Sequence, residues 1–181
     1  MKTKLLAVIT IMGLFIISGC AKADESDQSV DIDNILMNQK IVFIMSVSSY
    51  AERYAAGYFI DAKGKKHIYG LYDQWPFESI EKEYAYLLEH YDEFETIDFF
   101  DDKTLRECTE CLYYINPNSE TKEEGNILFD FSVNILYGIK QIDGHEEIVE
   151  LESFTGILER LDDPYADQIY EIFGDTWFAP K

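Results

Sequence analysis

Two cysteines three positions apart form the motif that most readily suggests chemistry. Cys108 and Cys111 make a C-x-x-C pair, which can act in redox exchange in an oxidising compartment. A reactive pair is usually found at a helix N-terminus, where the helix dipole lowers the thiol pKa. Here the expected helix begins well before Cys108, and Glu107 and Glu110 add charge that disfavours the thiolate. Three interpretations stay open: buried thiols on an apolar helix face, a structural disulfide, and a catalytic redox pair.

No metal-binding or nucleophile motif is complete in the sequence. Zinc requires two ligands beyond the cysteine pair, and the three histidines are scattered among different expected elements. Asp31-Ile32-Asp33 begins like a calcium-binding EF-hand loop but lacks the glycine that this loop requires. Ser79 to Lys82 matches S-x-x-K, yet it coincides with an expected helix start. We therefore predict no catalytic residue, no metal and no cofactor, and hence a protein that is not an enzyme.

The N-terminal residues are organised like an export signal. Lys2 and Lys4 precede an apolar run from Leu5 to Ile17, which is too short to span a bilayer. The following Ile17-Ser18-Gly19-Cys20 resembles the lipobox of bacterial membrane lipoproteins, in which the cysteine thiol receives a diacylglycerol and the chain is cut before it. The resemblance implies a signal peptide over residues 1–19 and lipid on Cys20. It also implies a mature protein held at the extracytoplasmic face of the cell membrane, since several acyl chains anchor a protein stably.

An acidic segment follows the cysteine. Ala21 to Asp33 contains four Asp and one Glu, and its large apolar residues are Val30 and Ile32 alone. Such a composition cannot bury a core, so residues 20–34 are predicted to be the lipid attachment site and a flexible tether. Residues 35–181 are then expected to form a single folded domain, because their number suffices for a hydrophobic core.

The charge of the chain limits its partners. It carries 35 acidic and 15 basic residues, a formal net charge of −20. Such a surface repels nucleic acid, so we predict no nucleic-acid partner. The 13 tyrosines, 12 phenylalanines and two tryptophans exclude a wholly disordered chain, because most of them must be buried.

Hydrophobic periodicity predicts an α+β fold with a mainly antiparallel sheet. The sheet is built from two hairpin regions, with a helical pair between them and a C-terminal helix. Gly64 is expected in the left-handed position of the first hairpin loop, and Asp143-Gly144 predicts a second hairpin. Asp101 or Asp102 and then Asp163-Pro164 are expected to start helices, and Gly174 is expected to end the last one. The polar residues 118–126 predict a loop. Strands are expected over 40–48, 54–61, 66–73, 127–132, 134–142, 147–153 and 157–161, and helices over 80–91, 102–114 and 164–174.

Aromatic residues are concentrated in and after the first hairpin. Tyr58, Tyr69, Tyr72 and Trp75 form the candidate binding surface, since tyrosine and tryptophan suit interfaces with proteins or glycans. The alternative interpretation is that these side chains fill the core and its rim.

Two segments, Gly57 to Asp73 and Tyr137 to Phe173, resemble parts of small uncharacterised lipoproteins of Gram-positive gut bacteria. That resemblance supplies no activity and no site. We predict a lipid-anchored extracytoplasmic protein that binds a protein or glycan partner without catalysis. One alternative is an inhibitor or immunity-like protein that binds a basic partner. The other is a thiol–disulfide oxidoreductase that uses Cys108 and Cys111.

Overall fold

A computed structural model describes residues 30–49, 54–72, 78–116, 118–126, 132–142 and 144–177. Within them, one antiparallel sheet runs in the order β4-β3-β2-β1-β6-β7-β8-β5. The α+β fold class and the mainly antiparallel sheet are therefore confirmed. The signal peptide, Cys20 and Trp75 lie outside the described residues.

The described chain begins with a short helix, which is followed by three strands. Two helices with a strand between them come next, and then four strands and a final helix. The strands are β1 (Ile41–Ser49), β2 (Tyr54–Asp61), β3 (Lys65–Tyr72), β4 (Glu95–Phe99), β5 (Thr121–Asn126), β6 (Ser132–Ile142), β7 (His145–Phe154) and β8 (Ile157–Leu161). The helices are α1 (Ile32–Asn38), α2 (Ile80–Glu89), α3 (Asp102–Tyr114) and α4 (Pro164–Trp177), with a 3₁₀ turn η1 (Tyr91–Glu93) after α2.

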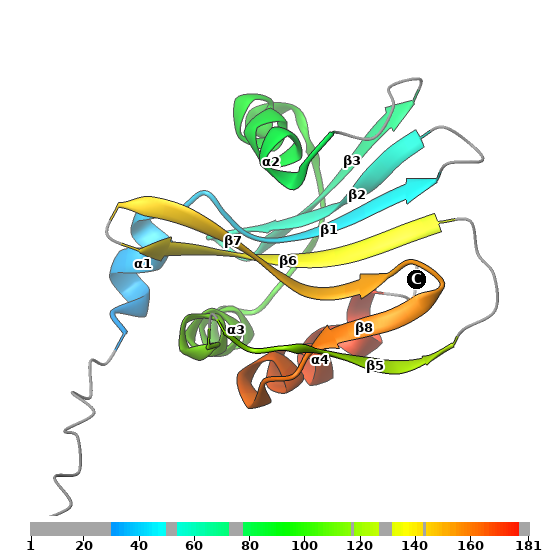
Figure 1. Ribbon diagram of the computed structural model, residues 1–181. Coiled ribbons are helices and arrows are strands. Elements are labelled where there is room, and N and C mark those ends of the chain that lie inside the picture. Colours follow the sequence, from blue (N-terminus) through cyan, green and yellow to red (C-terminus); the bar gives the residue numbers. More distant parts are fainter. Residues whose placement is uncertain are drawn as a thin grey trace, which may run out of the picture.

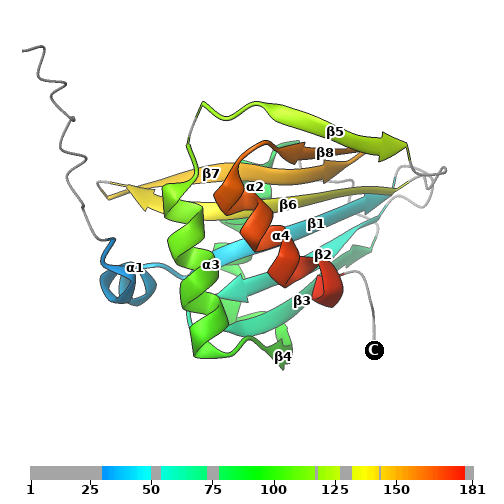
Figure 2. The same ribbon diagram turned by 90° about the horizontal axis from the view of Figure 1, so that it is seen from below.

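Helices cover both faces of the sheet. Helix α2 lies on one face, and α3 and α4 lie together on the other (Figures 1 and 2). Strand β1 is central and pairs with β2 and β6, and its residues 41–45 are buried on both sides. A strand covered on both faces needs no polar alternation, which explains its continuous apolar sequence.

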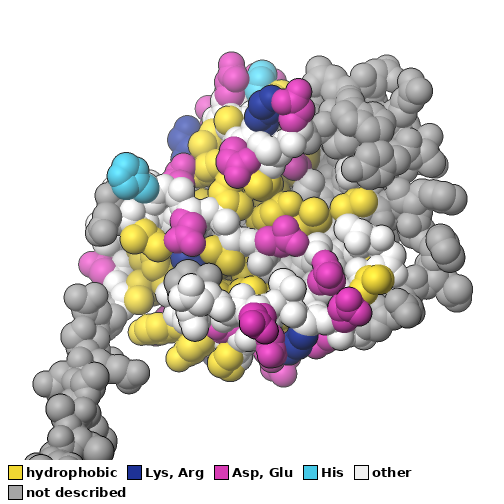
Figure 3. All heavy atoms as spheres, in the orientation of Figure 1, with side chains coloured by type: hydrophobic (Ala, Val, Ile, Leu, Met, Phe, Trp, Pro, Cys, Tyr) yellow, Lys and Arg dark blue, Asp and Glu magenta, His cyan; other side chains and the backbone are white. Residues whose placement is uncertain are grey.

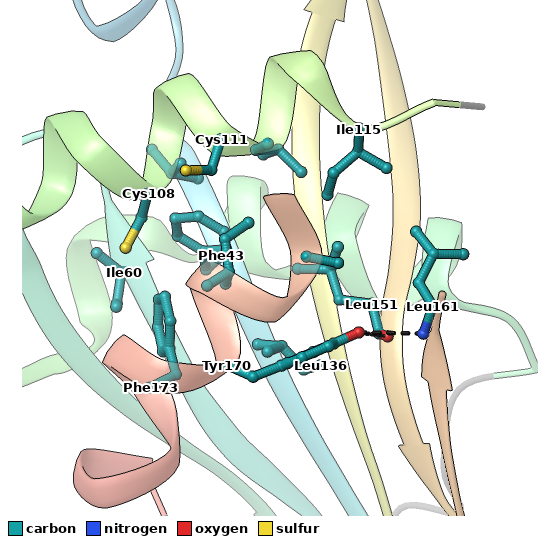
Figure 4. Close-up of a cluster of buried hydrophobic side chains, with 14 of the residues drawn as sticks. Phe43, Ile60, Cys108, Cys111, Ile115, Leu136, Leu151, Leu161, Tyr170 and Phe173 are labelled. Carbon is teal, nitrogen blue, oxygen red and sulfur yellow. Dashed lines mark hydrogen bonds between the residues drawn. The ribbon is translucent and has the colours of Figure 1, made fainter. Parts of the chain in front are cut away.

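Two apolar layers result from this arrangement. The layer under α2 includes Phe59, Tyr84 and Leu87. The layer under α3 and α4 includes Phe43 and Phe173 (Figure 4). The rings of Phe43 and Phe173 lie 4.9 Å apart between their centroids. The helices are thus held by burial of apolar surface, which contributes roughly 1.5–3 kcal/mol for each large side chain fully removed from water.

Glycines act at the positions where the backbone requires them. Gly64 and Gly144 have φ of +76° and +80°, which confirms the left-handed position in the first hairpin loop and fits the two-residue turn predicted in the second. Gly57 serves close packing instead, since a Cβ there would lie 2.1 Å from the carbonyl oxygen of Met45.

The predictions fail at the edges and ends of the fold. Residues 121–126, inside the predicted loop 118–126, form the edge strand β5, where Lys122 lies within 4 Å of Glu124, Asp162 and Asp167. Edge strands carry such charged residues, so strand formation there leaves no apolar signal. Edge strand β4 was not predicted.

Two helix boundaries also differ from expectation. Helix α1 begins inside the predicted tether, because Asp31 Oδ1 accepts the amide of Asn34 at 3.1 Å. Helix α4 passes through Gly174 to Trp177, so the predicted end at this glycine is wrong. Gly174 lies inside the helix, and a glycine ends a helix only where the chain turns left-handed after it. Of the predicted strand 127–132, only Ser132 is described.

Candidate functional site

The cysteine pair lies in the core and carries no disulfide. Cys108 and Cys111 are both free and buried on the face of α3 that packs towards α4 and the sheet (Figure 4). The structural-disulfide alternative is therefore wrong for this structure, and three residues of helix between two cysteines give poor disulfide geometry. Burial, followed by the influence of Cys111 and Glu107, raises the pKa of the Cys108 thiol far above its usual value. Burial and the charges of Glu110 and Glu107 also raise that of Cys111. Both thiols stay protonated at neutral pH, which is unfavourable for attack on a disulfide.

The predicted aromatic surface is only partly described. Tyr69 is 2% exposed and donates a hydrogen bond to the carboxylate of Glu83, so its place on a binding surface is wrong. Tyr58 is half-buried, and the ammonium of Lys66 lies 4.6 Å from its ring centroid. The side chain of Tyr72 and all of Trp75 lie outside the described residues, so their role stays a prediction.

Glu83 is a buried carboxylate that sequence reasoning missed. It lies on the inner face of α2, where Tyr69 donates to Oε1 and the Ser46 hydroxyl donates to Oε2 at 2.9 Å. Burial raises its pKa, although the hydrogen bonds from Tyr69 and Ser46 oppose this effect. Its position three residues after Ile80 and four before Leu87, on the apolar face of the helix, was a signal available in the sequence. We assign it to the fold, since its two partners are supplied by the sheet beneath it.

A pocket of about 550 Å³ lies where α1, η1, the start of α3 and the β2–β3 loop meet. We call it the basic pocket, after Lys40, Lys63 and Arg106 in its wall. The main-chain amide of Ala62 donates to the carbonyl of Lys40 at 3.0 Å and so fixes the β2–β3 loop to the start of β1. Its volume falls in the usual range for small-molecule sites, roughly 300–1,000 Å³.

The three cations of this pocket differ in their partners. Arg106 is held by Asp33 at 2.6 Å and by Asp102 at 2.7 Å, and these two aspartates also line the pocket. Lys40 and Lys63 form no ion pair with any described residue, and the Lys40 ammonium lies 5.6 Å from the ring centroid of Tyr91. Two exposed lysines without an ion pair thus line one pocket of a chain whose net charge is −20.

A buried network supports the floor of the basic pocket. Asp61 is fully buried, and its Oδ1 accepts the amides of Lys63 and Lys65 at 2.8 Å each. Its Oδ2 accepts the Tyr91 hydroxyl at 2.5 Å and lies 3.3 Å from His67 Nε2. Burial, and then the hydrogen bond to Asp61, raise the pKa of Tyr91. The phenol therefore remains a protonated, fixed part of the pocket wall.

The far side of this network places a hydroxyl beside the histidine. Thr96 Oγ1 lies 3.4 Å from His67 Nδ1, so Thr96, His67 and Asp61 follow one another in the order of a nucleophile, base and acid. The imidazole is 4% exposed and stacks on Phe59 with 4.6 Å between centroids. Thr96 does not line the basic pocket, whereas Tyr91 does. The arrangement thus positions Tyr91 and the hairpin loop rather than an attacking hydroxyl.

Gln39 gives the pocket wall an unsatisfied group. Its side chain is buried, and Nε2 donates to the carbonyls of Ile41 at 2.7 Å and Ile139 at 2.6 Å. Its Oε1 accepts no hydrogen bond from the described residues. A buried acceptor without a donor costs roughly 1–3 kcal/mol, and such groups recur at functional positions.

A second, acidic hollow lies between α3 and α4. Its volume is about 310 Å³, and its wall contains Glu107, Glu110 and Cys111 together with Tyr114 and Tyr165. The two tyrosine rings lie 5.3 Å apart between centroids and are more than a third exposed. On the face of the molecule drawn in Figure 3, acidic side chains lie among apolar and other side chains.

Comparisons with known proteins assign neither a family nor a function to this chain. Neither models of protein families, nor curated proteins, nor solved structures match this chain. Among the described residues, no three His, Cys, Asp or Glu side chains are grouped to hold a metal ion. In the same part of the chain, every helix is too short or too polar to cross a membrane.

Proposed function

We propose that this protein is a lipid-anchored extracytoplasmic binding protein that acts without catalysis and takes its ligand in the basic pocket. The observation that carries the proposal is a pocket of ligand size with two lysines that have no acidic partner. Charged groups left without partners at a concave site favour a ligand of opposite charge, because the ligand neutralises them on binding.

The position of the pocket in the chain suits an anchored binder. Residues 21–31 separate Cys20 from the first residue of α1, and α1 itself contributes Asp33, Leu36 and Met37 to the pocket wall. Eleven residues span at most about 40 Å when fully extended. A lipid on Cys20 would therefore keep the pocket within this distance of the membrane surface.

The state of the cysteines favours binding over thiol–disulfide exchange. Cys108 and Cys111 lie away from the start of α3, are buried among apolar side chains, and have raised pKa values. An exchange enzyme needs an accessible thiol that ionises near neutral pH. We therefore place the redox alternative below the binding function.

The anchor is tested by replacing its cysteine. Cys20→Ser is expected to move the protein from the detergent phase to the aqueous phase in a phase-partition assay and to abolish lipid-modified mass. Cys108→Ala is the matched control, and it should leave both readouts unchanged because this thiol lies in the folded domain. Identical partition and mass for the Cys20→Ser variant and the wild type would refute the anchor.

The binding site is tested by filling it. Ala62→Trp places a large side chain in the basic pocket, whereas Ala85→Trp places the same side chain on the exposed surface of α2. Small molecules that copurify with the native protein should be seen by native mass spectrometry in the wild type and in Ala85→Trp. They should be lost in Ala62→Trp, provided that its circular dichroism spectrum is native. Equal retention in both variants would place binding elsewhere.

A basic protein partner is the second candidate, and the hollow between α3 and α4 favours it. Glu107, Glu110 and the paired rings of Tyr114 and Tyr165 offer both charge and aromatic faces to a lysine or arginine side chain. Binding of an octalysine peptide should then weaken steeply with added salt and weaken further in Glu110→Gln. Binding that is independent of Glu110 would indicate only the general acidity of the chain.

A further inference from the structure

The charged and apolar residues that line the basic pocket indicate the class of ligand that it binds. We infer that it binds an amphiphilic anion, with a phosphate or carboxylate group at Lys40 and Lys63 and an apolar part against Leu36, Met37 and the ring of Tyr91. This inference rests on the proposed binding function and narrows it to one class of ligand.

The lysines of the described chain differ in their surroundings. Lys82, Lys103 and Lys122 each lie within 4 Å of a carboxylate, whereas Lys65 and Lys140 form no ion pair with a described residue and line no pocket described above. Lys40 and Lys63 have no such partner although they share one pocket. The carboxylates of that pocket, Asp33 and Asp102, are both engaged by Arg106. The pocket therefore carries net positive charge at its two free lysines, and an anion is the ligand that compensates it.

Apolar side chains line the same pocket as the two lysines. Leu36 and Met37 of α1 line the pocket, and Met37 is 79% exposed. Ala62 and the ring of Tyr91 continue this surface towards Lys40. A small inorganic anion leaves these side chains in water, whereas a short alkyl chain attached to the anion covers them. Each methylene buried contributes roughly a factor of four in affinity.

The pocket is pre-organised on the side that receives the charged group. The Asp61 carboxylate holds the amides of Lys63 and Lys65 and the hydroxyl of Tyr91, so the loop that carries Lys63 is fixed before a ligand arrives. Ligand binding then costs little conformational entropy in this loop, which favours a high affinity for a small ligand.

Hexyl phosphate is the probe that tests this inference. The mature lipoprotein in phosphatidylcholine nanodiscs is titrated with hexyl phosphate, hexanoate or neutral hexanol by isothermal calorimetry. We expect both anions to bind at least tenfold more tightly than hexanol. Lys40→Gln and Lys63→Gln should each weaken hexyl phosphate binding about tenfold, the effect of losing one charge-assisted hydrogen bond. Lys82→Gln, on the exposed surface of α2, is the matched control and should leave binding unchanged.

The outcomes separate this inference from the function on which it rests. Equal binding of hexanol and hexyl phosphate, unaffected by the two lysine variants but abolished by Ala62→Trp, would overturn the anionic ligand and leave the binding site intact. Binding that survives Ala62→Trp, or no saturable binding up to about 10 mM hexyl phosphate, would overturn both. The source of the anion is tested by adding phosphatidylglycerol to the nanodiscs: competition with hexyl phosphate identifies a lipid headgroup, and its absence identifies a soluble amphiphile.

Discussion

Asp61→Ala removes the carboxylate that holds the floor of the basic pocket. Its Oδ2 is bonded to the half-buried Tyr91 hydroxyl and faces the buried His67 ring, and neither partner is free to turn fully to water. Hydrogen bonds to a charged group contribute roughly 1.5–3 kcal/mol each, so losing two of them should lower the free energy of unfolding by about 3–6 kcal/mol. The amides of Lys63 and Lys65 lie at a surface hairpin and add less, because water can replace Oδ1.

Urea denaturation at pH 7, followed by circular dichroism, measures this loss. In a domain of this size it corresponds to a fall in Tm of roughly 10 °C. Asp61→Asn keeps an acceptor for the loop amides and should lose only about 1–2 kcal/mol. The control is Asp92→Ala, an exposed neighbour of Tyr91, which should stay within about 0.5 kcal/mol of the wild type. A loss below about 1 kcal/mol for Asp61→Ala would refute the supporting role of the network.

Three further predictions concern buried groups outside the pocket. Burial raises the pKa of Glu83, so its contribution to stability is complete below pH 4.5 and falls as the pH rises through the native pKa. Glu83→Gln should therefore flatten this part of the pH profile of stability, measured by urea denaturation. An unchanged profile would contradict this prediction. The Tyr170 hydroxyl accepts the amide of Leu161 at 3.1 Å and donates to the carbonyl of Leu151 (Figure 4). Tyr170→Phe should therefore lower the free energy of unfolding by roughly 2–4 kcal/mol. An unchanged free energy of unfolding in the same assay would count against this prediction. Cys108 and Cys111 should react with Ellman's reagent only after denaturation, and rapid reaction of the native protein would restore the redox alternative.

The centre of the fold could be predicted from the sequence because its strands and helices bury apolar side chains. The apolar run at the start of β1 and the glycine at 64 each have one simple physical explanation. Strands β4 and β5 could not be predicted in the same way. They lie at the two edges of the sheet, where β4 pairs with β3 and β5 pairs with β8. These edge strands form through backbone pairing with their neighbours, so their sequences need no alternating hydrophobic pattern.

The candidate site could not be predicted from the sequence for a different reason. Lys40 and Lys63 resemble ordinary surface lysines, and Asp61 and Tyr91 stand 30 residues apart. Only the tertiary arrangement brings the β2–β3 loop, η1, α1 and α3 around one pocket. The spacing of Cys108 and Cys111 is a local pattern that can be seen in the sequence, but their burial in α3 is unfavourable for thiol–disulfide exchange.

The position of the ligand is the central claim, and an NMR titration tests it most directly. Two-dimensional ¹H–¹⁵N spectra of the protein are recorded while hexyl phosphate is added. We expect saturable shifts centred on the amides of Lys40, Lys63, Tyr91 and Arg106, with those of α2 and β7 unchanged. Shifts confined to the hollow between α3 and α4, or the absence of saturable shifts, would contradict it.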